Sequence, residues 1–307
     1  MFLANTVLMI RPLHFGFNEE AFLTNKFQQR ITDLTDQQVQ QKALQEFDDF
    51  VELLRGVGIH VEIFEDTDAH FTPDAIFPNN WFSTHGSGHL VTYPMAHQNR
   101  QLERRSDIIN KIIKKYGYSK REALEHYEES GQSLEGTGSL IFDHENKIVY
   151  AAISPRTQIE LVHEIANLLS YEAITFKAMG GSNELIYHTN VMLCIGHSYA
   201  IVGAETIVSE DRKRVLDALQ SSGKTLLTLT NQQVYQSFAG NMLQLQNDKG
   251  KTILILSDSA MNSLSENQLD FINQNNDQTL VATIPTIEKV GGGSARCMLA
   301  EIFHPHT

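Results

Sequence analysis

One arrangement of predicted elements recurs along the chain and limits the folds open to it. Two strand-like runs joined by a tight turn are followed by a helical segment and then by another strand-like run. Copies of this arrangement cover residues 75–128, 139–178, 191–229 and 242–284. In the first copy residues 121–128 look helical locally, and the repeat predicts a strand there. Repeats of this length are typical of radial or stacked architectures, in which each unit packs against its neighbours.

A fifth copy is expected to combine the two ends of the chain. The run 297–303 would pair with the run 6–10, a helix ending before Gly56 would follow, and residues 60–64 would form the last strand. Closing a unit from both ends predicts a ring, because a ring leaves no free sheet edge. The sequence therefore predicts an α/β fold with five ββαβ units in a single domain, residues 1–307.

Composition narrows the classes of function. The chain has 307 residues, of which 41% are hydrophobic and 20% are charged, an ordinary globular balance. A formal net charge of -13 argues against a general nucleic-acid binder, although local arginines can still hold an anionic group. No apolar run approaches the roughly 20 residues that span a bilayer, and the first residues lack the features of a signal peptide. Two cysteines, Cys194 and Cys297, cannot make a disulfide framework, so we expect a cytoplasmic protein.

The unusual residues fall in the loops that join one unit to the next. In a ring these five loops should meet at one end of the axis, where a rigid scaffold can hold an active site. The last loop contains three glycines, Gly291–Gly293, which can bring a ligand close to the main chain, followed by Cys297. Such a thiol is a candidate nucleophile, and the alternative is a buried cysteine after a turn. The other loops carry Asn79, Asn80, Glu135, Gly180, Gly181, Ser182, Asn183, His188, Asn190 and the segment 238–241.

Three of these loops resemble the guanidine-modifying, or pentein, superfamily. The matching motifs are Leu134-Glu135-Gly136-Thr137-Gly138, His188-Thr189-Asn190 and Gly291-Gly292-Gly293-Ser294-Ala295-Arg296-Cys297. Members include arginine deiminase, dimethylarginine hydrolase, succinylarginine dihydrolase and the amidinotransferases. The branch that contains the citrulline-utilisation hydrolases is most similar, through Phe77-Pro78-Asn79-Asn80-Trp81 and Tyr187-His188-Thr189-Asn190. The resemblance covers nearly the whole chain and implies a five-bladed ββαβ propeller, in agreement with the repeat.

The resemblance also implies roles for individual residues. Cys297 would be the nucleophile, His188 the general acid and base, and Glu135 the partner of that histidine. A free thiol is mostly protonated at neutral pH, and bound substrate or a protonated His188 would favour the thiolate. Attack would leave a covalent thio-intermediate, which water activated by the same histidine would then hydrolyse. The residues implied in substrate binding are Asn79, Asn80, Asn190, Arg156, Gly292 and Arg100, with Arg104 as the alternative to Arg100.

Two asparagines separate this sequence from the arginine deiminases. According to the resemblance, those enzymes have acidic residues at the positions of Asn80 and Asn190. A carboxylate pair suits a guanidinium cation, whereas an amide offers a donor and an acceptor without charge and suits a neutral ureido group. The leading hypothesis is therefore a hydrolase of a C–N bond in citrulline or a related arginine derivative. No cofactor is implied, and the scattered histidines do not form a compelling set of metal ligands.

Three alternatives stay open. The enzyme could hydrolyse dimethylarginine or arginine, it could transfer an amidino group to an acceptor amine, or the propeller could bind a ligand without catalysis. The presence of Cys297, His188 and Glu135 together favours an enzyme over the last alternative. Cys194 lies in an apolar run and is expected in the core. The expected partner is a small amino-acid substrate, with neither nucleic acid nor membrane, and a homodimer is one option for the assembly.

Overall fold

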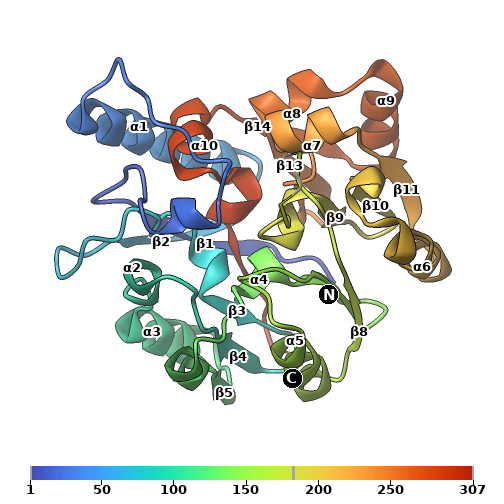
Figure 1. Ribbon diagram of the computed structural model, residues 1–307, viewed down its shortest axis with the longest axis horizontal. Helices are drawn as coiled ribbons and strands as arrows, with labels where there is room; N and C mark the ends of the chain where they lie inside the picture. Colours follow the sequence, from blue (N-terminus) through green and yellow to red (C-terminus); the bar gives the residue numbers. More distant parts are fainter. Residues whose placement is uncertain (1, 182–183, 306–307) are drawn as a thin grey trace.

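Five small mixed sheets form the blades of a ring in the computed structural model, which describes residues 2–181 and 184–305 (Figure 1). Each sheet has three strands, and its middle strand pairs antiparallel with one neighbour and parallel with the other. The longer helices lie at the periphery of the ring in Figure 1. The predicted α/β fold with five ββαβ units is confirmed.

The first blade joins the two ends of the chain, as the repeat predicts. It contains β15 (Ala300–Ile302), β1 (Thr6–Arg11) and β2 (His60–Glu65). The other four blades follow in chain order: β3 (Phe82–Thr84), β4 (His89–Thr92) and β5 (Lys120–Ala123); β6 (Ile141–Asp143), β7 (Ile148–Ala152) and β8 (Glu172–Phe176); β9 (Leu193–Ile195), β10 (Tyr199–Val202) and β11 (Thr225–Thr228); β12 (Leu243–Gln246), β13 (Thr252–Ser257) and β14 (Gln278–Ala282).

Side-chain hydrogen bonds tie the first blade to the second. Thr6 on β1 lies opposite Ile302 on β15 in the antiparallel pair and opposite His60 on β2 in the parallel pair. Thr84 at the end of β3 donates its hydroxyl to the carbonyl of Glu301 at 2.9 Å. The same hydroxyl accepts the amide hydrogen of Phe303 at 2.9 Å. These bonds satisfy the carbonyl of Glu301 in β15 and the amide of Phe303 just after it. Neither group has a partner in β1, because β15 is the innermost strand of its sheet and pairs with β1 on one side only.

The helices cover the outer strands, which are less buried than the middle strands. The longer ones are α1 (Asp36–Gly56), α3 (Ser106–Tyr116), α5 (Ile159–Leu169), α6 (Ser209–Ser221) and α9 (Glu266–Asn275), and the shorter ones are α2 (Gln98–Gln101), α4 (Gly136–Ser139), α7 (Asn231–Ser237), α8 (Asp258–Ser263) and α10 (Pro285–Gly291). In α1 the capping box formed by Thr35 and Gln38 fixes the start. Its buried residues recur at helical spacing: Val39, Ala43, Phe47, Phe50, Val51 and Leu54. They lie in the same hydrophobic cluster as Val7 and Met9 of β1.

The structure corrects several predicted boundaries. The irregular copy does contain a strand, because β5 pairs parallel with β4, and the 3-10 helix Glu125–Ser130 that follows explains its helical appearance. The strand predicted from residue 75 begins only at Phe82, since the preceding residues form a site loop. The helical segment expected within the first copy is split into α2 and α3. Helices α4, α7, α8 and α10 were not predicted.

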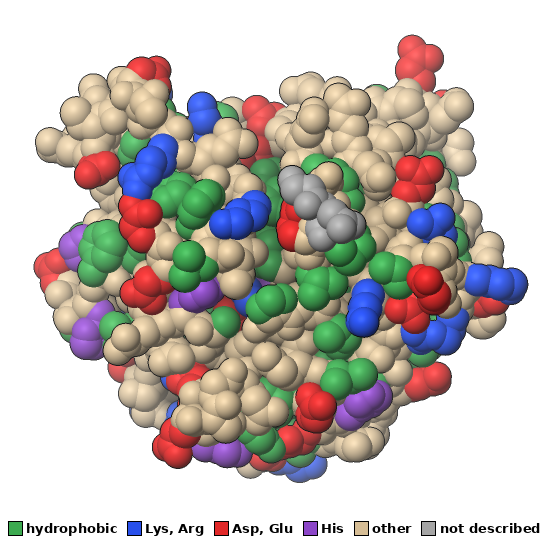
Figure 2. All heavy atoms as spheres, viewed as in Figure 1, with side chains coloured by type: hydrophobic (Ala, Val, Ile, Leu, Met, Phe, Trp, Pro, Cys, Tyr) green, Lys and Arg blue, Asp and Glu red, His purple; other side chains and the backbone are tan. Residues whose placement is uncertain are grey.

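The described part of the chain contains no helix both long and apolar enough to cross a membrane. On the face seen in Figure 2, basic side chains lie singly among acidic and hydrophobic ones. This face also carries the ends of the blades at which the predicted site loops lie.

Candidate active site

Four short helical turns bring the predicted site loops together at one end of the ring. They are η2 (Pro78–Asn80), α4, η4 (Thr189–Val191) and η6 (Ala295–Met298). The turn α4 contacts both η2 and η4, and η2 contacts η6. Every residue of the four turns is buried. The polar side chains of these loops are therefore held away from bulk water, where electrostatic interactions are stronger.

Cys297 lies in η6 and is only 3% exposed. Its Sγ atom accepts hydrogen bonds from two amides, Asn241 Nδ2 at 3.3 Å and Asn190 Nδ2 at 3.4 Å. Cys297 and His188 line the same small cavity. A thiol, amide donors and an imidazole are thus assembled from three different blades.

His188 is oriented by the carboxylate of Glu135, whose Oε2 lies 2.7 Å from His188 Nε2. A carboxylate can only accept, so Nε2 carries the proton and Nδ1 keeps its lone pair. Nδ1 makes no hydrogen bond to any residue that the structure describes. Burial lowers the pKa of His188 to about 4, although Glu135 opposes this shift by favouring the charged imidazole. His188 is therefore neutral and suited to act as a base, which differs from the expected protonated form.

Glu135 is a fully buried carboxylate held by positive neighbours. Burial alone would raise the pKa of Glu135, but Arg156, His188 and Arg100 together lower it well below its ordinary value. Arg156 Nη1 donates to Oε2 at 3.3 Å, and Arg100 Nη1 lies 3.7 Å from the same oxygen. The other oxygen, Oε1, accepts the main-chain amide of Ala96 at 3.1 Å. Glu135 is consequently ionised and positions His188 rather than exchanging a proton.

The two arginines of the cavity wall already have partners within the protein. Arg100 binds both carboxylate oxygens of Glu103 at 2.9 Å and donates Nη1 to Asn80 Oδ1 at 2.8 Å. Arg156 donates Nε to Thr24 Oγ1 and Nη2 to the carbonyl of Ala21, both at 2.9 Å. Both arginines line the cavity.

Arg104, the alternative carboxylate clamp, is placed elsewhere. Its guanidinium pairs with Glu128, and it does not line the cavity. Of the two candidates, only Arg100 is at the site.

Several buried polar atoms at the site have no partner among the described residues. Three of them are Asn80 Nδ2, Asn190 Oδ1 and Asp74 Oδ1, and both amide atoms of the neighbouring Asn79 are unpaired as well. Asp74 lines the cavity, and its second oxygen accepts Asn18 Nδ2 at 2.8 Å. Because unpaired buried polar atoms are costly, those on Asn80 and Asp74, which line the cavity, mark where a polar ligand would be bound.

The motif glycines allow the loops to approach one another closely. A Cβ atom on Gly138 would lie 2.5 Å from Asn80 Nδ2 and 2.7 Å from His188 Nδ1. At Gly292 the backbone has φ +63°, and a Cβ would lie 2.7 Å from the amide nitrogen of Gln28. The carbonyl of Gly292 accepts the hydroxyl of Tyr187 at 2.6 Å. The glycines therefore serve close packing between loops, and the main chain of Gly292 is held by the protein itself.

A segment near the N-terminus covers the cavity. It includes the short turn η1 (Ala21–Leu23) that binds Arg156 through the carbonyl of Ala21. Asn25 Nδ2 donates to the carbonyl of Gly292 at 3.1 Å, and Gln29 donates its amide to the carbonyl of Lys289 at 2.6 Å. These contacts place a cover over the thiol and histidine that the sequence pattern did not reveal.

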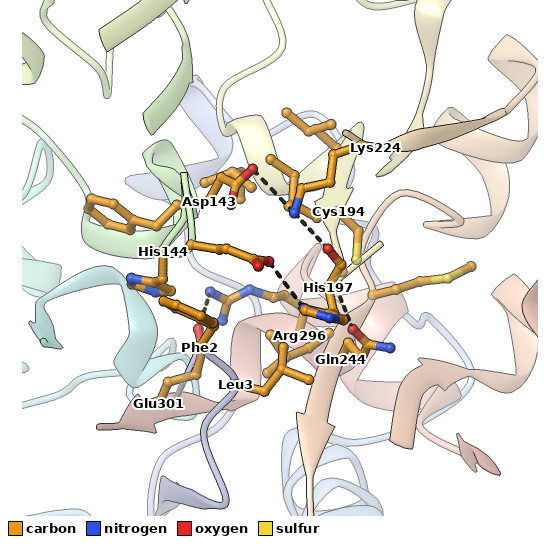
Figure 3. A pocket seen from close by; sticks show the side chains of 18 residues that line it. Phe2, Leu3, Asp143, His144, Cys194, His197, Lys224, Gln244, Arg296 and Glu301 are labelled. Carbon is orange, nitrogen blue, oxygen red and sulfur yellow. Dashed lines mark hydrogen bonds and ion pairs between the residues drawn. The ribbon is translucent and has the colours of Figure 1, made fainter. Parts of the chain in front are cut away.

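A second pocket lies among the inner strands β6, β9, β12 and β15, and Figure 3 shows the side chains that line it. Its main charged groups are already paired: Lys224 Nζ lies 3.3 Å from Asp143 Oδ2, and Arg296 Nη2 lies 3.1 Å from Glu301 Oε2. Cys194 is in its wall, and burial raises the pKa of this thiol to about 12. Cys194 is thus a protonated core cysteine, as the sequence predicts, and this pocket lacks the catalytic groups.

A family model described as "N,N dimethylarginine dimethylhydrolase, eukaryotic" matches residues 11–304. The chain belongs to this family. It is therefore a member of the pentein, guanidine-modifying superfamily, as its motifs indicate. No curated protein matches the sequence.

Solved structures of other penteins share the fold. The substrate-bound N-terminal domain of ArgZ, a cyanobacterial arginine dihydrolase of the ornithine–ammonia cycle, is 16% identical, with a TM-score of 0.74 and 98% of each chain covered. Unliganded AgrE is 16% identical, with a TM-score of 0.75, and the match covers 98% of this chain but 40% of AgrE. A dimethylarginine dimethylaminohydrolase bound to S-methyl-L-thiocitrulline is 12% identical, with a TM-score of 0.64 and coverage of 98% and 100%.

Most of the residues singled out in this pentein sequence do meet in space. Six of them line the cavity: Cys297, His188, Asn80, Arg100, Arg156 and Gly292. Glu135 lies behind the histidine and Asn190 beside the sulfur. Like Glu135 and Asn190, Asn79 does not line the cavity, and its main-chain carbonyl accepts the hydroxyl of Thr137 at 3.3 Å. Ser182 and Asn183 lie outside the described residues.

Three residues at the site were missed. Asp74 precedes a run that was interpreted as a strand, and Asn25 lies in a polar segment without a recognisable motif. Asn241 ends the loop 238–241, which was placed at the correct end of the ring without a role. The position of this loop just before a first strand of a blade was the one available signal for Asn241.

Gly138→Ala tests the close packing of the loops. The added methyl group would displace Asn80 and His188, so activity should fall by at least about 100-fold, as expected for a misplacement near 1 Å. Steady-state kinetics and thermal unfolding would be measured together. Gly56→Ala is the matched control, because nothing lies within 4 Å of its added Cβ, and it should keep activity. Full activity in Gly138→Ala would contradict this geometry.

The protonation of His188 can be measured by ¹⁵N NMR of its imidazole, assigned through His188→Gln. At pH 7 the ring should be neutral with the proton on Nε2, and its titration midpoint should lie below the ordinary 6.5. In Glu135→Gln the midpoint should fall further, because the carboxylate that favours the imidazolium is removed.

The same shift predicts acid sensitivity of the fold. A folded-state pKa below the unfolded value means that the unfolded chain binds more protons, so stability should fall as pH drops from 6.5 towards about 4. Urea unfolding at several pH values would measure this. In the NMR titration, a midpoint at or above 6.5 for the His188 imidazole would show that it is not a neutral base at pH 7.

Proposed function

We propose that this pentein hydrolyses a C–N bond of a ureido or guanidino group in a free amino acid, through a covalent bond to Cys297. Its preferred substrate in this proposal is citrulline. The assembly of thiol, neutral imidazole and ionised carboxylate around one cavity supports a hydrolase over a non-catalytic binding propeller.

The orientation of Asn80 carries the preference for citrulline. Arg100 donates to Asn80 Oδ1, so Nδ2 is the group left free, beside Gly138 and His188. A ureido oxygen accepts from such a donor. A guanidinium group offers only N–H donors and would leave the Asn80 amide unpaired, which is costly in a buried site. The free acceptor on Asn190 Oδ1 would take an N–H of the ureido group.

The geometry supports a two-step reaction. Sγ of Cys297 attacks the ureido carbon while His188 Nδ1 takes the thiol proton and returns it to the departing nitrogen, so that a C–S bond forms and a C–N bond breaks. Water then attacks the thiocarbamate, Nδ1 takes its proton, and the C–S bond breaks to restore the thiol. Loss of carbon dioxide from the carbamate gives ornithine, ammonia and carbon dioxide from citrulline and one water.

Opposite charges in the cavity wall suit the two ends of an amino acid. The partner-free oxygen of Asp74 would accept the α-ammonium group. Arg156 would face the α-carboxylate, the role that the pentein resemblance implies for it. Both groups are fully buried, so each interaction would be little screened by solvent.

Hydrolysis of arginine or dimethylarginine is the second candidate. The description of the matching family and the arginine dihydrolases among the similar structures favour it. Amidino transfer would use the same covalent intermediate with an amine in place of water, so it differs only in the second step.

One assay tests the proposed function. The protein is incubated separately with citrulline, arginine and methylated arginines, and ammonia, ornithine, urea and methylamines are identified. Citrulline should give ornithine and ammonia, and Cys297→Ala should abolish turnover without unfolding the protein, because a small side chain at the site removes chemistry and little packing. Cys194→Ala, a buried cysteine outside the site, should keep turnover. Turnover in Cys297→Ala, or none with any of these substrates, would refute the proposal.

Asn80→Asp tests the charge argument. A carboxylate in place of the amide would repel a ureido oxygen and attract a guanidinium, so the ratio of kcat/KM for citrulline over arginine should fall roughly tenfold to a hundredfold. Asn276→Asp is the matched control, because Asn276 is a buried asparagine that does not line the cavity, and it should leave the ratio unchanged. An unchanged ratio in Asn80→Asp would mean that Asn80 does not select the reacting group.

A further inference from the structure

The sulfur of Cys297 receives its hydrogen bonds from neutral amides. Asn241 Nδ2 and Asn190 Nδ2 are the donors, at 3.3 and 3.4 Å. Among the described residues, no lysine, arginine or histidine donates a hydrogen bond to Sγ. A buried thiolate needs stabilisation, because removal from water disfavours the charged form. At this site the directly bound groups that can supply it are the two amides.

The amide of Asn241 is held in one orientation. Its Oδ1 accepts the main-chain amide of Arg296 at 3.1 Å. Its Nδ2 donates to the carbonyl of Asn190 at 3.0 Å, which leaves the second N–H for Sγ of Cys297. A flipped amide would place two donors, Nδ2 and the Arg296 N–H, against each other. The sulfur also lies 3.6 Å from Asn241 Oδ1, to which the protonated thiol can donate. The two main-chain contacts of Asn241 still fix an N–H towards the sulfur.

The two asparagines differ in what they leave free. Asn190 has an oxygen without a partner among the described residues, whereas both amide atoms of Asn241 are engaged. Neither asparagine lines the cavity that Cys297 and His188 share, so the difference between them is the free oxygen of Asn190. Asn190 can thus serve both sulfur and substrate, and Asn241 serves the sulfur alone.

The loop of the fifth blade is shaped to place this side chain. Phe238 ends α7 with φ 50°, and its carbonyl accepts the amide of Asn241 at 2.8 Å. Gly240 passes so close to η4 that a Cβ would lie 2.4 Å from the carbonyl of Val191. This close approach brings Asn241 against both Asn190, in the loop that carries His188, and Cys297.

We propose that Asn241 is the residue that orients Cys297 and stabilises its thiolate by a hydrogen bond. The inference rests on Cys297 being the nucleophile of the proposed function. It adds the loop before β12 to the catalytic assembly, and it assigns stabilisation of the thiolate, once His188 has taken the proton, to a fixed amide dipole. When the C–S bond breaks at the end of the reaction, the same N–H stabilises the negative charge on the sulfur until the thiol is restored.

The test is the pH dependence of alkylation of Cys297 by iodoacetamide, followed by peptide mass spectrometry so that Cys194 is counted separately. This measurement needs no substrate. In Asn241→Ala the pH midpoint of alkylation should rise by about one unit, which is roughly tenfold less thiolate at neutral pH. In Asn241→Asp, where an oxygen can still accept from Arg296, the midpoint should rise further because a carboxylate faces the sulfur.

A buried asparagine away from the site provides the control. Asn276 bonds Tyr199, Gln244 and the carbonyl of Ile272, so Asn276→Ala loses a similar set of contacts. It should lower stability without moving the alkylation midpoint. With a substrate, Asn241→Ala should lower kcat with little change in KM, because Asn241 does not line the cavity.

The outcomes separate this inference from the proposed function. A shifted midpoint in both variants supports the role of Asn241 even if none of the tested substrates is turned over. An unchanged midpoint in Asn241→Asp overturns the inference even if citrulline is hydrolysed. Failure of both variants to fold, while Asn276→Ala folds, would also overturn it, because Asn241 would then act through the fold alone.

Discussion

The site depends on the pairing of the buried Glu135 carboxylate with the positive and hydrogen-bond-donating groups around it. The charge of the carboxylate is removed from water and is balanced by Arg156 and the Nε2 proton of His188, with Arg100 close by. Removing one member of such a pair typically costs about 3–5 kcal/mol, because the remaining charge is left uncompensated. Through this carboxylate the imidazole has one tautomer and one orientation.

The same carboxylate links the site to the cover. Arg156 uses one part of its guanidinium for Glu135 and the rest for Ala21 and Thr24 in the N-terminal segment. Closure of the cavity and the protonation state of His188 are thereby connected through one side chain. Burial by the cover also removes the solvent that would otherwise stabilise a charged imidazole.

The architecture was predictable because its signal is local and repeated. Hairpin, helix and strand recur with enough regularity that a strand was correctly expected around β5, where the charged sequence Lys120–Ala123 gives little local indication. The loops that carry Cys297, His188 and Glu135 followed from that topology together with the motifs.

What the sequence could not predict are properties that arise between segments. Nothing in the segment around Asn241 indicates that its amide faces a sulfur 56 residues away in the chain. The neutral state of His188 depends on burial by distant loops, and the free oxygen of Asp74 depends on which of its neighbours are already bonded. The close packing at Gly138 and Gly292 was not predicted for the same reason, since it is visible only once the opposing loop is in place.

The first blade has a consequence for the order of events during synthesis. Its middle strand β1 precedes its inner strand β15 and the thiol of Cys297 by some 290 residues along the chain. A growing chain can form the other blades, but it cannot close the ring or complete the catalytic centre until this last strand has been translated. Cys297 therefore reaches the site together with the strand that closes the ring, as the last of the proposed catalytic residues.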